Sequence, residues 1–486
     1  HGALPGQIVV AVIGGGITGL TAAYLLKAAG KRVAVFEREH IGAGESGNTS
    51  AHLTYVTDTS ITELQKTFGK SAAQRAWYGG ARAIDLIESI ASTGGISCGF
   101  QRVPAFQCAP FFNDTGEGAD ALARDAALAK ELGFDATFHQ TGPIAGRACV
   151  EYSNQGIVHP LDYLAGLALA IDGDGSYVFD KAELAEVLQD PLSITVNGET
   201  IACGDVIIAT HVPLTGSTSL PSAMLFQTKI YPYSSYVLGA LIDDDVLAPG
   251  LYFDTADPYY FLRIHDVPEG RYAVFGGKDH KTGQESDTEA RFNALQSALE
   301  ALIPSARIER RWSGQVIETD DGLPFIGKSA EHQYIATGYA GNGLTFGTLA
   351  GMMLYDAVVG RDNQWREIFD PNRKATTLGA ITEYLSENAD YPFYLIADRL
   401  KHDRSGVENV PQGEGRVLDL DGKRVACHRT ASGDVITVSA VCTHMGCIVH
   451  WNNADKTWDC PCHGSRFTPD GLVLGGPAEM PLEKVE

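Results

Sequence analysis

Two short segments near the end of the chain restrict its fold more than any other feature. The first, CTHMGC, begins at Cys442, and the second, CPCHGS, begins at Cys460. The patterns Cys442-x-His444 and Cys460-x-x-His463 supply two thiolates and two imidazoles from two loops. A [2Fe–2S] cluster with two cysteines on one iron and two histidines on the other requires this set of ligands. We therefore expect these four residues to hold such a cluster.

A structural zinc site is the alternative, because cysteine and histidine also bind Zn²⁺. Zinc folds usually pair their ligands as C-x₂₋₄-C, and zinc would leave the His-Gly-Ser sequence and the loop glycines unexplained. The spacing therefore favours the iron–sulfur cluster.

The paired motif resembles the Rieske proteins of the cytochrome bc complexes over residues 405–486. This resemblance implies a small all-β domain in which Cys447 and Cys462, one in each loop, form a disulfide that clamps the loops together. Ser465 matches a serine that hydrogen-bonds a bridging sulfide, and the segment GGPAEMP resembles the loop that covers the cluster. Phe467 stands where high-potential members carry a tyrosine, so we expect a lower reduction potential than theirs.

The segment IVVAVIGGGITGLTAAYLLKAAGKRVAVFERE near the start of the chain predicts a β-α-β unit. Gly14, Gly16 and Gly19 follow its first strand and open its helix, as the dinucleotide-binding fingerprint requires. The helix N-terminus offers free N–H groups to a pyrophosphate. Glu37, at the end of the second strand, is placed to accept hydrogen bonds from a ribose. A glycine-rich turn without a ligand is the alternative.

Three further segments resemble the D-amino-acid oxidase and glycine oxidase family of flavoproteins, with a likeness that covers roughly residues 7–360. They are GAGESGNTSAHLT at 42–54, WSGQVIETDDGLPFIG at 312–327 and ATGYAGNGLTFGTLAG at 336–351. The resemblance implies FAD, with its ring near the third segment. Some relatives tether their flavin through a histidine near His52, but His52 does not align with it, so we expect non-covalent FAD. The expected cofactor contacts are Gly14, Gly16, Gly19, Glu37, Ser46, His52, Thr210, Gly338, Gly341, Asn342 and Gly343.

The substrate side departs from this family. Amino-acid oxidases carry an arginine for the substrate carboxylate where this chain has Val316, and valine cannot pair with a carboxylate. Arg263 is the candidate replacement, with a surface salt bridge as the alternative. The segment GGKDHKTG places Lys278, Asp279 and His280 at a strand end, and we take His280 as the candidate proton acceptor. An ordinary polar turn is the competing interpretation.

These segments predict an α/β FAD-binding domain of the Rossmann-like, glutathione-reductase type, an antiparallel-sheet substrate domain and a C-terminal all-β Rieske domain. The nucleotide-binding pieces lie far apart in the sequence, so that domain is expected to be discontinuous. A helical linker, with Pro392 kinking or splitting its helix, is expected before the last domain. The expected ranges are 7–90, 150–215 and 311–360 (FAD-binding), 91–149 and 216–310 (substrate), 361–404 (linker) and 405–486 (Rieske).

The net charge and the cysteines of the chain indicate which binding partners and which cellular compartment to expect. The 486 residues carry a formal net charge of −23, which would be repelled by nucleic acid and by anionic lipid. The glycines interrupt the most apolar stretch, so no membrane span is expected, and no basic segment precedes it as in a signal peptide. Five cysteines lie outside the paired motif without a disulfide pattern, which favours a reducing, cytoplasmic location. They are Cys98, Cys108, Cys149, Cys203 and Cys427.

The two expected cofactors predict an electron relay. A small-molecule substrate (an amine, an N-methylated amine or an amino acid) gives a hydride to FAD, and single electrons then leave through the cluster to a one-electron carrier or quinone. Reverse flow, an O₂-using oxidase with a structural or redox-sensing Rieske domain, and a non-enzymatic electron carrier are alternatives. A Rieske oxygenase is set aside, because no two of the fourteen histidines are four or five residues apart, as its mononuclear iron site usually requires.

Overall fold

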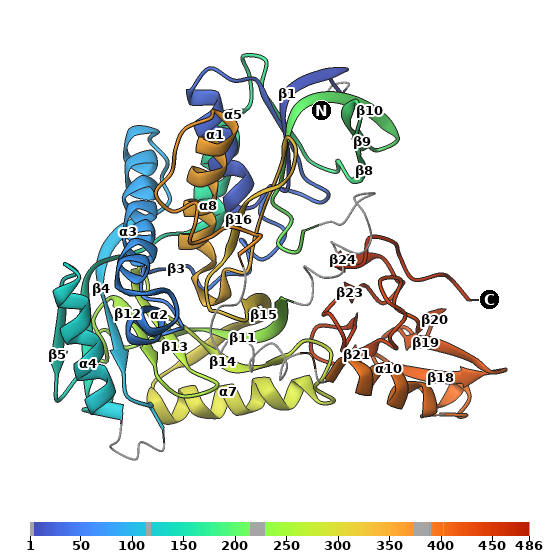
Figure 1. Cartoon of the computed structure of the whole chain (residues 1–486). Helices are drawn as coiled ribbons and strands as arrows, with labels where there is room; N and C mark the ends of the chain where they lie inside the picture. The colour runs from blue at the N-terminus through green and yellow to red at the C-terminus, as the bar shows by residue number, and fades with distance from the viewer. Residues whose placement is uncertain are drawn as a thin grey trace.

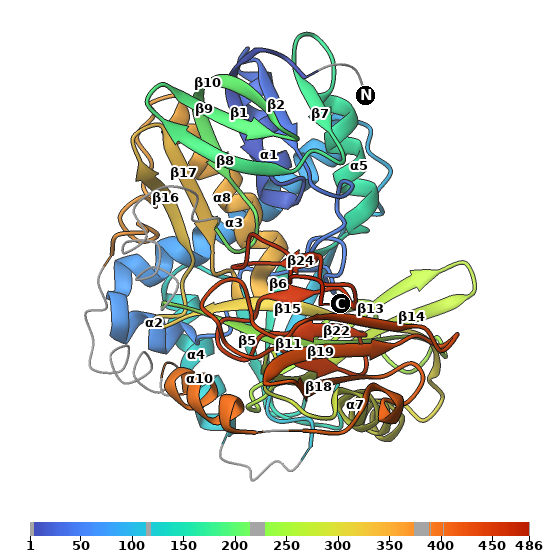
Figure 2. The ribbon, with the colours of Figure 1, turned by 90° about the vertical axis from the view of Figure 1, so that its right-hand side faces the viewer.

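The computed structural model describes residues 4–112, 118–213, 229–373, 388, 390–401 and 403–485. These residues form an α/β layer at the top of Figure 1, a large second sheet beneath it, and a small β-domain at the C-terminal end of the chain. Figure 2 shows the small domain from the front, below the first sheet. Within the described ranges, no helix combines the length and apolar character needed to cross a membrane.

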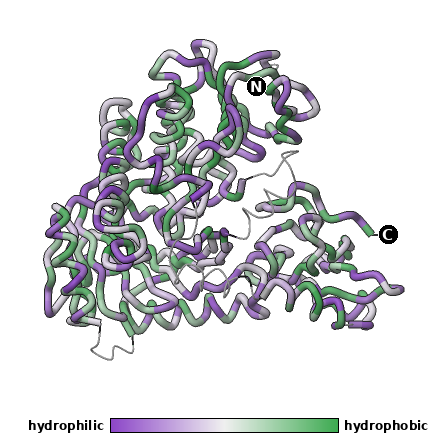
Figure 3. The backbone as a smooth tube through the Cα atoms, in the orientation of Figure 1, coloured by the Kyte–Doolittle hydropathy of each residue, from purple (hydrophilic) through white to green (hydrophobic). Residues whose placement is uncertain are grey.

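The first sheet has the strand order β16-β17-β10-β1-β2-β7, and the β8–β9 hairpin extends β10. The strands from β17 to β7 run parallel, and β16 is antiparallel to β17. In β1, Val10 and Val12 face the core beneath the helices, whereas Ala11 and Ile13 face the core beside the hairpin. Burial on both faces explains its continuous apolar run. Figure 3 shows green, hydrophobic stretches of the tube within this layer. The bounds are β1 (Gln7–Ile13), β2 (Val33–Phe36), β7 (Tyr177–Phe179), β8 (Leu184–Gln189), β9 (Leu192–Val196), β10 (Glu199–Ile208), β16 (Phe325–Ala330) and β17 (Gln333–Thr337).

The helices of this layer bring two N-termini to the same place. Helix α8 (Gly343–Val358) packs against α1 (Ile17–Ala28), α3 (Lys70–Thr93) also contacts α8, and α5 (Pro160–Ile171) contacts α1. Glycine allows the close approach, because a Cβ atom on Gly347 would lie 2.5 Å from Ile17 Cγ2. The first turns of α1 and α8 therefore start side by side, and the 3₁₀ turn η1 (Ala340–Asn342) leads into α8.

The second sheet has the order β15-β11-β14-β13-β12-β4-β6-β3, with β5 beside β6. Neighbouring strands are antiparallel except for β12 and β4. Helix α7 (Thr288–Leu302) covers one face and buries Phe292, Leu295 and Leu299 against it. Helices α2 (Ile61–Phe68) and α4 (Gly118–Glu131) lie at the far end. The strands are β3 (His52–Leu53), β4 (Gln101–Cys108), β5 (Ala136–His139), β6 (Cys149–Ile157), β11 (Ile230–Ile242), β12 (Gly250–Asp254), β13 (Phe261–Val267), β14 (Gly270–Lys281) and β15 (Arg307–Thr319).

The predicted fold class is confirmed, but two strands lie in a different sheet from the one their expected domain implies. Strands β6 and β15 fall largely within 150–215 and 311–360, the ranges expected for the FAD-binding domain, yet both belong to the second sheet. The chain returns to the first sheet only at β16. A strand's sheet is decided by its hydrogen-bonding partner, here β11 for β15, and the local sequence pattern does not identify that partner.

The C-terminal domain consists of two small antiparallel sheets around a core that contains Trp458 and Phe467. The domain has short strands joined by turns that contain glycine, as expected for an all-β Rieske domain over residues 405–486. A short 3₁₀ turn, η2 (Val407–Asn409), precedes them. The strands are β18 (Gly415–Leu420), β19 (Lys423–Arg429), β20 (Val435–Ser439), β21 (His450–Asn452), β22 (Thr457–Asp459), β23 (Arg466–Phe467) and β24 (Val473–Gly475).

The segment expected to be a linker has two different environments. Trp365, Ile368 and Phe369 are buried in the core of the α/β layer, so the start of this segment is part of that layer. Helix α10 (Asp390–Leu400) packs on the small domain and contains Pro392, and Asn388 before it is also helical. The expected helix from 378 to 387 lies outside the described residues.

The small domain packs directly on the second sheet. The Gln315 side-chain amide donates to the carbonyl oxygen of Gly464 over 2.9 Å, and Gln284 donates to that of Pro461 over 3.0 Å. A Cβ atom on Gly464 would lie 2.3 Å from Pro232 Cγ, so only glycine permits this approach. The loop that carries Cys460 and His463 is therefore held against β11 and β15.

Helix α10 is tied to this interface by a buried carboxylate. Asp398 is 2% exposed and lies 2.9 Å from His450 Nε2, while His450 Nδ1 lies 2.7 Å from the carbonyl oxygen of Gly283. Lys401 donates to the same carboxylate over 2.8 Å. Burial acts to raise the pKa of Asp398, but the hydrogen bonds from His450 and Lys401 outweigh it and hold the pKa below its ordinary value of 3.8.

This tie predicts acid sensitivity. A carboxyl whose pKa is lower in the folded state stabilises the fold above its unfolded pKa, and that contribution is lost as the pH falls through the folded value. We expect Asp398→Asn to lower the free energy of unfolding at pH 7 by about 1–3 kcal/mol and to remove the part of the acid dependence below about pH 4. Urea unfolding from about pH 2 to 7 measures this, with the exposed Glu483→Gln as control. Parallel pH profiles for wild type and Asp398→Asn would contradict the prediction.

Candidate functional sites: a dinucleotide cavity and a cysteine–histidine centre

A cavity of about 1130 Å³ runs between the first sheet, the second sheet and the small domain. One end lies beside Glu37 and the β8–β9 hairpin, and the other beside Asp58 and Asp279. The small domain contributes Arg466 and residues of the segment 473–481 to its wall. All three parts of the protein therefore enclose one space.

The glycines of the fingerprint shape the middle of this cavity. Gly14 has a φ of +109°, and a Cβ atom there would lie 2.4 Å from the carbonyl oxygen of Ala209. A Cβ atom on Gly19 would lie 2.1 Å from the carbonyl oxygen of Gly14, so the turn and the helix must pack backbone to backbone. The N-terminus of α1 then faces a space that a pyrophosphate can enter. Ser46 accepts a hydrogen bond from the N–H of Ile17 over 3.0 Å and so joins the 42–54 loop to this helix.

Glu37 is held rigidly at the end of β2. One carboxylate oxygen accepts from the N–H of Gly15 over 2.8 Å, and the other accepts from the N–H of Glu39 over 2.9 Å. Both bonds orient the carboxylate along the cavity wall, where a ribose hydroxyl can donate to it.

The second glycine-rich turn closes the other side. Asn342 donates to the carbonyl oxygens of Thr54 (3.2 Å) and Val56 (2.9 Å), which joins the start of α8 to the loop after β3. His52, in β3, also lines the cavity and is 8% exposed. Most of the expected cofactor contacts line the cavity, and Gly19 and Gly338 shape the turns behind it. The lining residues among them are Gly14, Gly16, Glu37, Ser46, His52, Thr210, Gly341, Asn342 and Gly343.

The two candidate substrate residues lie elsewhere. The Arg263 guanidinium contacts the carbonyl oxygens of Val158 (3.3 Å) and Ala51 (3.5 Å), and burial lowers its pKa to about 10. His280 contacts the Tyr236 hydroxyl at 2.8 Å and the carbonyl oxygen of Lys281 at 2.8 Å. Neither is among the residues that line the cavity in the described parts of the chain.

For His280, a β-bulge in β14 explains this outcome, because the pairing with β11 shifts by one residue between Gly277 and His280, where Lys278 has a φ of +64°. Side chains of β14 point alternately to the two faces of the sheet, and Asp279 is the residue that faces the cavity. Its neighbour His280 therefore points away. Asp58 and Tyr259 also line this end, and neither was selected from the sequence. A strict period-two reading from the buried Phe275 would turn Asp279 toward the core under α7, so only the bulge brings Asp279 to the cavity.

The cysteine–histidine centre combines the two expected loops. The rings of His444 and His463 lie 5.0 Å apart between their centroids, and both Nδ1 atoms are buried without a hydrogen-bond partner in the described residues. Burial lowers the pKa of His444 to about 4 and that of His463 to about 3, which keeps both imidazoles neutral, as metal ligation requires. Cys442 and Cys460 are buried and free of disulfides. Two orphaned imidazole nitrogens beside two free thiols fit a [2Fe–2S] cluster.

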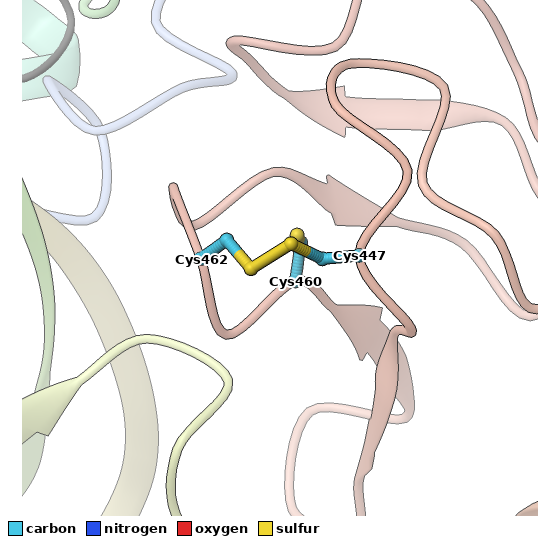
Figure 4. Close-up of side chains that lie close together, drawn as sticks. All are labelled: Cys447, Cys460 and Cys462. Carbon is cyan, nitrogen blue, oxygen red and sulfur yellow. A yellow bond between two sulfur atoms is a disulfide. The ribbon is translucent and has the colours of Figure 1, made fainter. Parts of the chain in front are cut away.

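A disulfide joins the same loops. Cys447 and Cys462 are bonded, with their Cα atoms 6.5 Å apart. The sulfur of Cys460 lies within 4.8 Å of both, as Figure 4 shows. Because two of these three sulfurs are bonded to each other, this trio offers one thiolate and is not itself a metal site. The disulfide instead holds the loop of His444 against the loop of His463.

The glycine turn at the start of α1 can be tested directly for flavin binding. Gly14→Ala places a methyl group 2.4 Å from a backbone oxygen at a φ of +109°, so the turn must shift away from the phosphates. We expect flavin affinity to fall by about tenfold or more, the equivalent of ~1.4 kcal/mol. The absorbance ratio near 450 and 280 nm after dialysis measures it. Gly30→Ala is the matched control, because Gly30 has a φ of +79° with open space around it and carries only the strain of roughly 1 kcal/mol. Equal flavin loss in both variants would contradict the assignment of the Gly14 turn to flavin binding.

Comparison with known proteins supports both sites. The chain matches the family model described as FAD dependent oxidoreductase over residues 10–357 and the Rieske [2Fe-2S] domain model over residues 403–486. It is 30% identical over 485 residues to the protein named as the Rieske 2Fe-2S iron-sulfur protein YhfW of Bacillus subtilis (strain 168), covering 98% of this chain and 93% of that protein.

Each part also has separate relatives. The cytochrome b6-f complex iron-sulfur subunit of Chlorobaculum tepidum is 40% identical over 78 residues, 16% of this chain and 42% of that subunit. Glycine oxidase from Geobacillus kaustophilus shares the fold with a TM-score of 0.64 at 20% identity, over 76% of this chain and 100% of that one. The two resemblances inferred from the sequence are thereby confirmed. The chain belongs to the family of FAD-dependent oxidoreductases. It binds FAD, and it carries a C-terminal Rieske domain that binds a [2Fe–2S] cluster.

Proposed function

We propose that this protein oxidises the C–N bond of a small amine and passes the electrons one at a time, within the same chain, to its Rieske cluster and then to an external acceptor. In the overall reaction the substrate R₂CH–NHR′ becomes the imine R₂C=NR′ with release of two electrons and two protons, and water then hydrolyses the imine. When bound, FAD supplies two-electron chemistry and the cluster supplies single-electron transfer. The observation that carries the proposal is the shared wall between the cavity and the cluster loops.

Gln315 forms the most direct connection. It is 3% exposed, lines the cavity, and donates through its side-chain amide to Gly464, the residue next to the candidate ligand His463. Its own N–H donates to Glu45 over 2.7 Å, which fixes the backbone at this point. One side chain and one peptide therefore separate the cavity from a cluster ligand.

The segment 473–481 forms a second part of the wall. The N–H of Ala478 donates to Ser465 over 3.0 Å, and Thr443 donates to the carbonyl oxygen of Met480 over 2.6 Å. The segment thus contacts both cluster loops while its other side lines the cavity. This arrangement supports transfer within one chain, without a swing of the small domain.

The two cluster loops differ in their exposure. The loop with His463 is covered by the second sheet, whereas Thr443 and Val441, beside the other loop, are exposed. We assign the exit of electrons to the His444 side, where a one-electron carrier or a quinone can approach. The net charge of −23 favours a carrier with a basic surface.

The decisive experiment mixes the oxidised protein anaerobically with a panel of amines, N-methylated amines and amino acids and records flavin absorbance and low-temperature EPR. We expect one class of compound to bleach the flavin and to produce the signal of the reduced cluster. In His463→Ala, which removes a ligand of the cluster, flavin bleaching should persist without the signal. Bleaching without an EPR signal in the wild type would refute transfer to the cluster, and no bleaching by any compound would refute C–N oxidation.

Gln315→Leu tests the connection itself. Leucine keeps the volume but cannot donate to Gly464, so we expect cluster reduction after flavin reduction to slow roughly fivefold, the equivalent of the ~1 kcal/mol of one hydrogen bond. Freeze-quench EPR measures the rate. Gln284→Leu is the matched control, because Gln284 donates to Pro461 in the same loop but does not line the cavity. An equal slowing in both variants would show that docking alone, and not Gln315, limits the transfer.

A further inference from the structure

We propose that the substrate end of the cavity binds an alkylamine as its ammonium cation, with no carboxylate on the amine carbon, and that Asp279 contacts the ammonium with Asp58 beside it. This inference rests on the proposed function and narrows its substrate class. It departs from the amino-acid substrates that the glycine oxidase fold would suggest by likeness alone.

Two carboxyl groups lie close enough at this end of the cavity for the charge of Asp58 to act on Asp279. Asp279 extends from β14 and Asp58 from the loop after β3, and both line the cavity. Asp58 accepts from the N–H of Gly341 over 2.8 Å and from the Tyr259 hydroxyl. One oxygen of Asp279, Oδ1, is buried and has no hydrogen-bond partner in the described residues. This oxygen is free to accept from a donor supplied by a ligand.

No cation of the protein compensates these carboxyls in the described parts of the chain. The groups that act on them are the N–H of Gly341, the hydroxyls of Tyr259 and Ser235, and Asp58 on Asp279. Burial raises the pKa of Asp58, and it raises that of Asp279 to about 7. Two enclosed carboxyls without a basic partner are stabilised when a cationic ligand enters.

The arginines that line the cavity are engaged elsewhere. Arg38 donates to the carbonyl oxygen of Leu474 over 2.7 Å. Arg466 pairs with Asp455 at 2.6 Å and with Asp459 at 3.2 Å. Neither is among the groups that act on Asp58 or Asp279. Neither arginine that lines the cavity therefore neutralises its carboxyl end.

The same geometry disfavours an amino acid. Val316 lines the cavity where the amino-acid oxidases carry their carboxylate-binding arginine, and Arg263 does not line it but contacts two backbone carbonyls through Nη1. A substrate carboxylate would enter a space that already contains Asp58 and Asp279, without a counter-charge. Apolar side chains that suit an alkyl chain line the same region: Val56, Val237, Phe253 and Phe261.

Asp279 is also placed to prepare the amine for oxidation. An ammonium nitrogen has no lone pair, so the substrate must lose one proton before its carbon can give up a hydride. The step is R₂CH–NH₃⁺ + Asp279–COO⁻ → R₂CH–NH₂ + Asp279–COOH, in which the N–H bond breaks and the proton moves to the carboxylate. Burial of Asp279 favours the protonated product of this step.

Ligand binding to the FAD-loaded protein tests the inference without turnover. Butylammonium and butyrate have similar chains and opposite charges, and each perturbs the visible flavin spectrum when it binds beside the ring. We expect butylammonium to bind at least about tenfold more tightly than butyrate, as a charge-assisted hydrogen bond of this kind provides. Asp279→Asn, and separately Asp58→Asn, should weaken butylammonium binding about tenfold while flavin content is unchanged. Asp266→Asn, an exposed carboxylate on β13 outside the cavity, is the matched control and should bind as the wild type does.

Reaction with a matched pair separates this inference from the proposed function. Norvaline is butylamine with a carboxylate added to the amine carbon, so the two differ only in the group at issue. Flavin reduction by butylamine and not by norvaline supports the inference. Reduction by norvaline alone, tighter binding of butyrate, or no effect of either aspartate variant would overturn it while amine oxidation still stands. Tight butylammonium binding without flavin reduction by any amine would instead overturn the proposed function and leave the cation site in place.

Discussion

The contact between the second cluster loop and the β11–β15 edge of the second sheet determines what the rest of this molecule can do. Gly464 packs against the ring of Pro232, and Gly283 packs against the backbone of Cys460, at distances where a single added carbon would collide. Such contacts have little tolerance, since packed interiors do not absorb an extra methylene without shifts. The loop that carries two ligands is therefore fixed beside the cavity, and the hydrogen bond from Gln315 spans the remaining gap.

The small C-terminal domain is held in place against the second sheet. This differs from an arrangement in which the cluster domain moves between an electron donor and an electron acceptor. Helix α10 strengthens this docking, because Arg399 donates to Gly446 in the first cluster loop and Tyr391 packs 5.0 Å from the His463 ring. One cluster loop is thus braced by the helix and the other by the sheet. The disulfide between Cys447 and Cys462 links the two cluster loops to each other.

Electrostatics divides the cavity into two regions. The glycine turn and the N-terminus of α1 offer N–H groups at the middle, where the phosphates of a dinucleotide belong. At the far end, Asp58 and Asp279 are enclosed without a basic partner in the described residues, and their raised pKa values record the cost of burying their charge. The protein therefore presents hydrogen-bond donors to the cofactor and acceptors to the substrate.

The sequence by itself determined both cofactors and the fold class, because the glycine fingerprint and the paired Cys/His loops are local patterns whose geometry follows from a few consecutive residues. The sequence did not determine features that depend on a partner residue far away in the chain. Arg263 and His280 were selected as the substrate residues, but neither lines the cavity, and a bulge in the pairing of β14 with β11 turns His280 away and brings Asp279 to the cavity. Only the tertiary structure placed β15 in the second sheet, set Gln315 between the cavity and Gly464, and enclosed two carboxyl groups together, because these contacts join residues far apart in the sequence, such as Gln315 and Gly464, which are 149 positions apart.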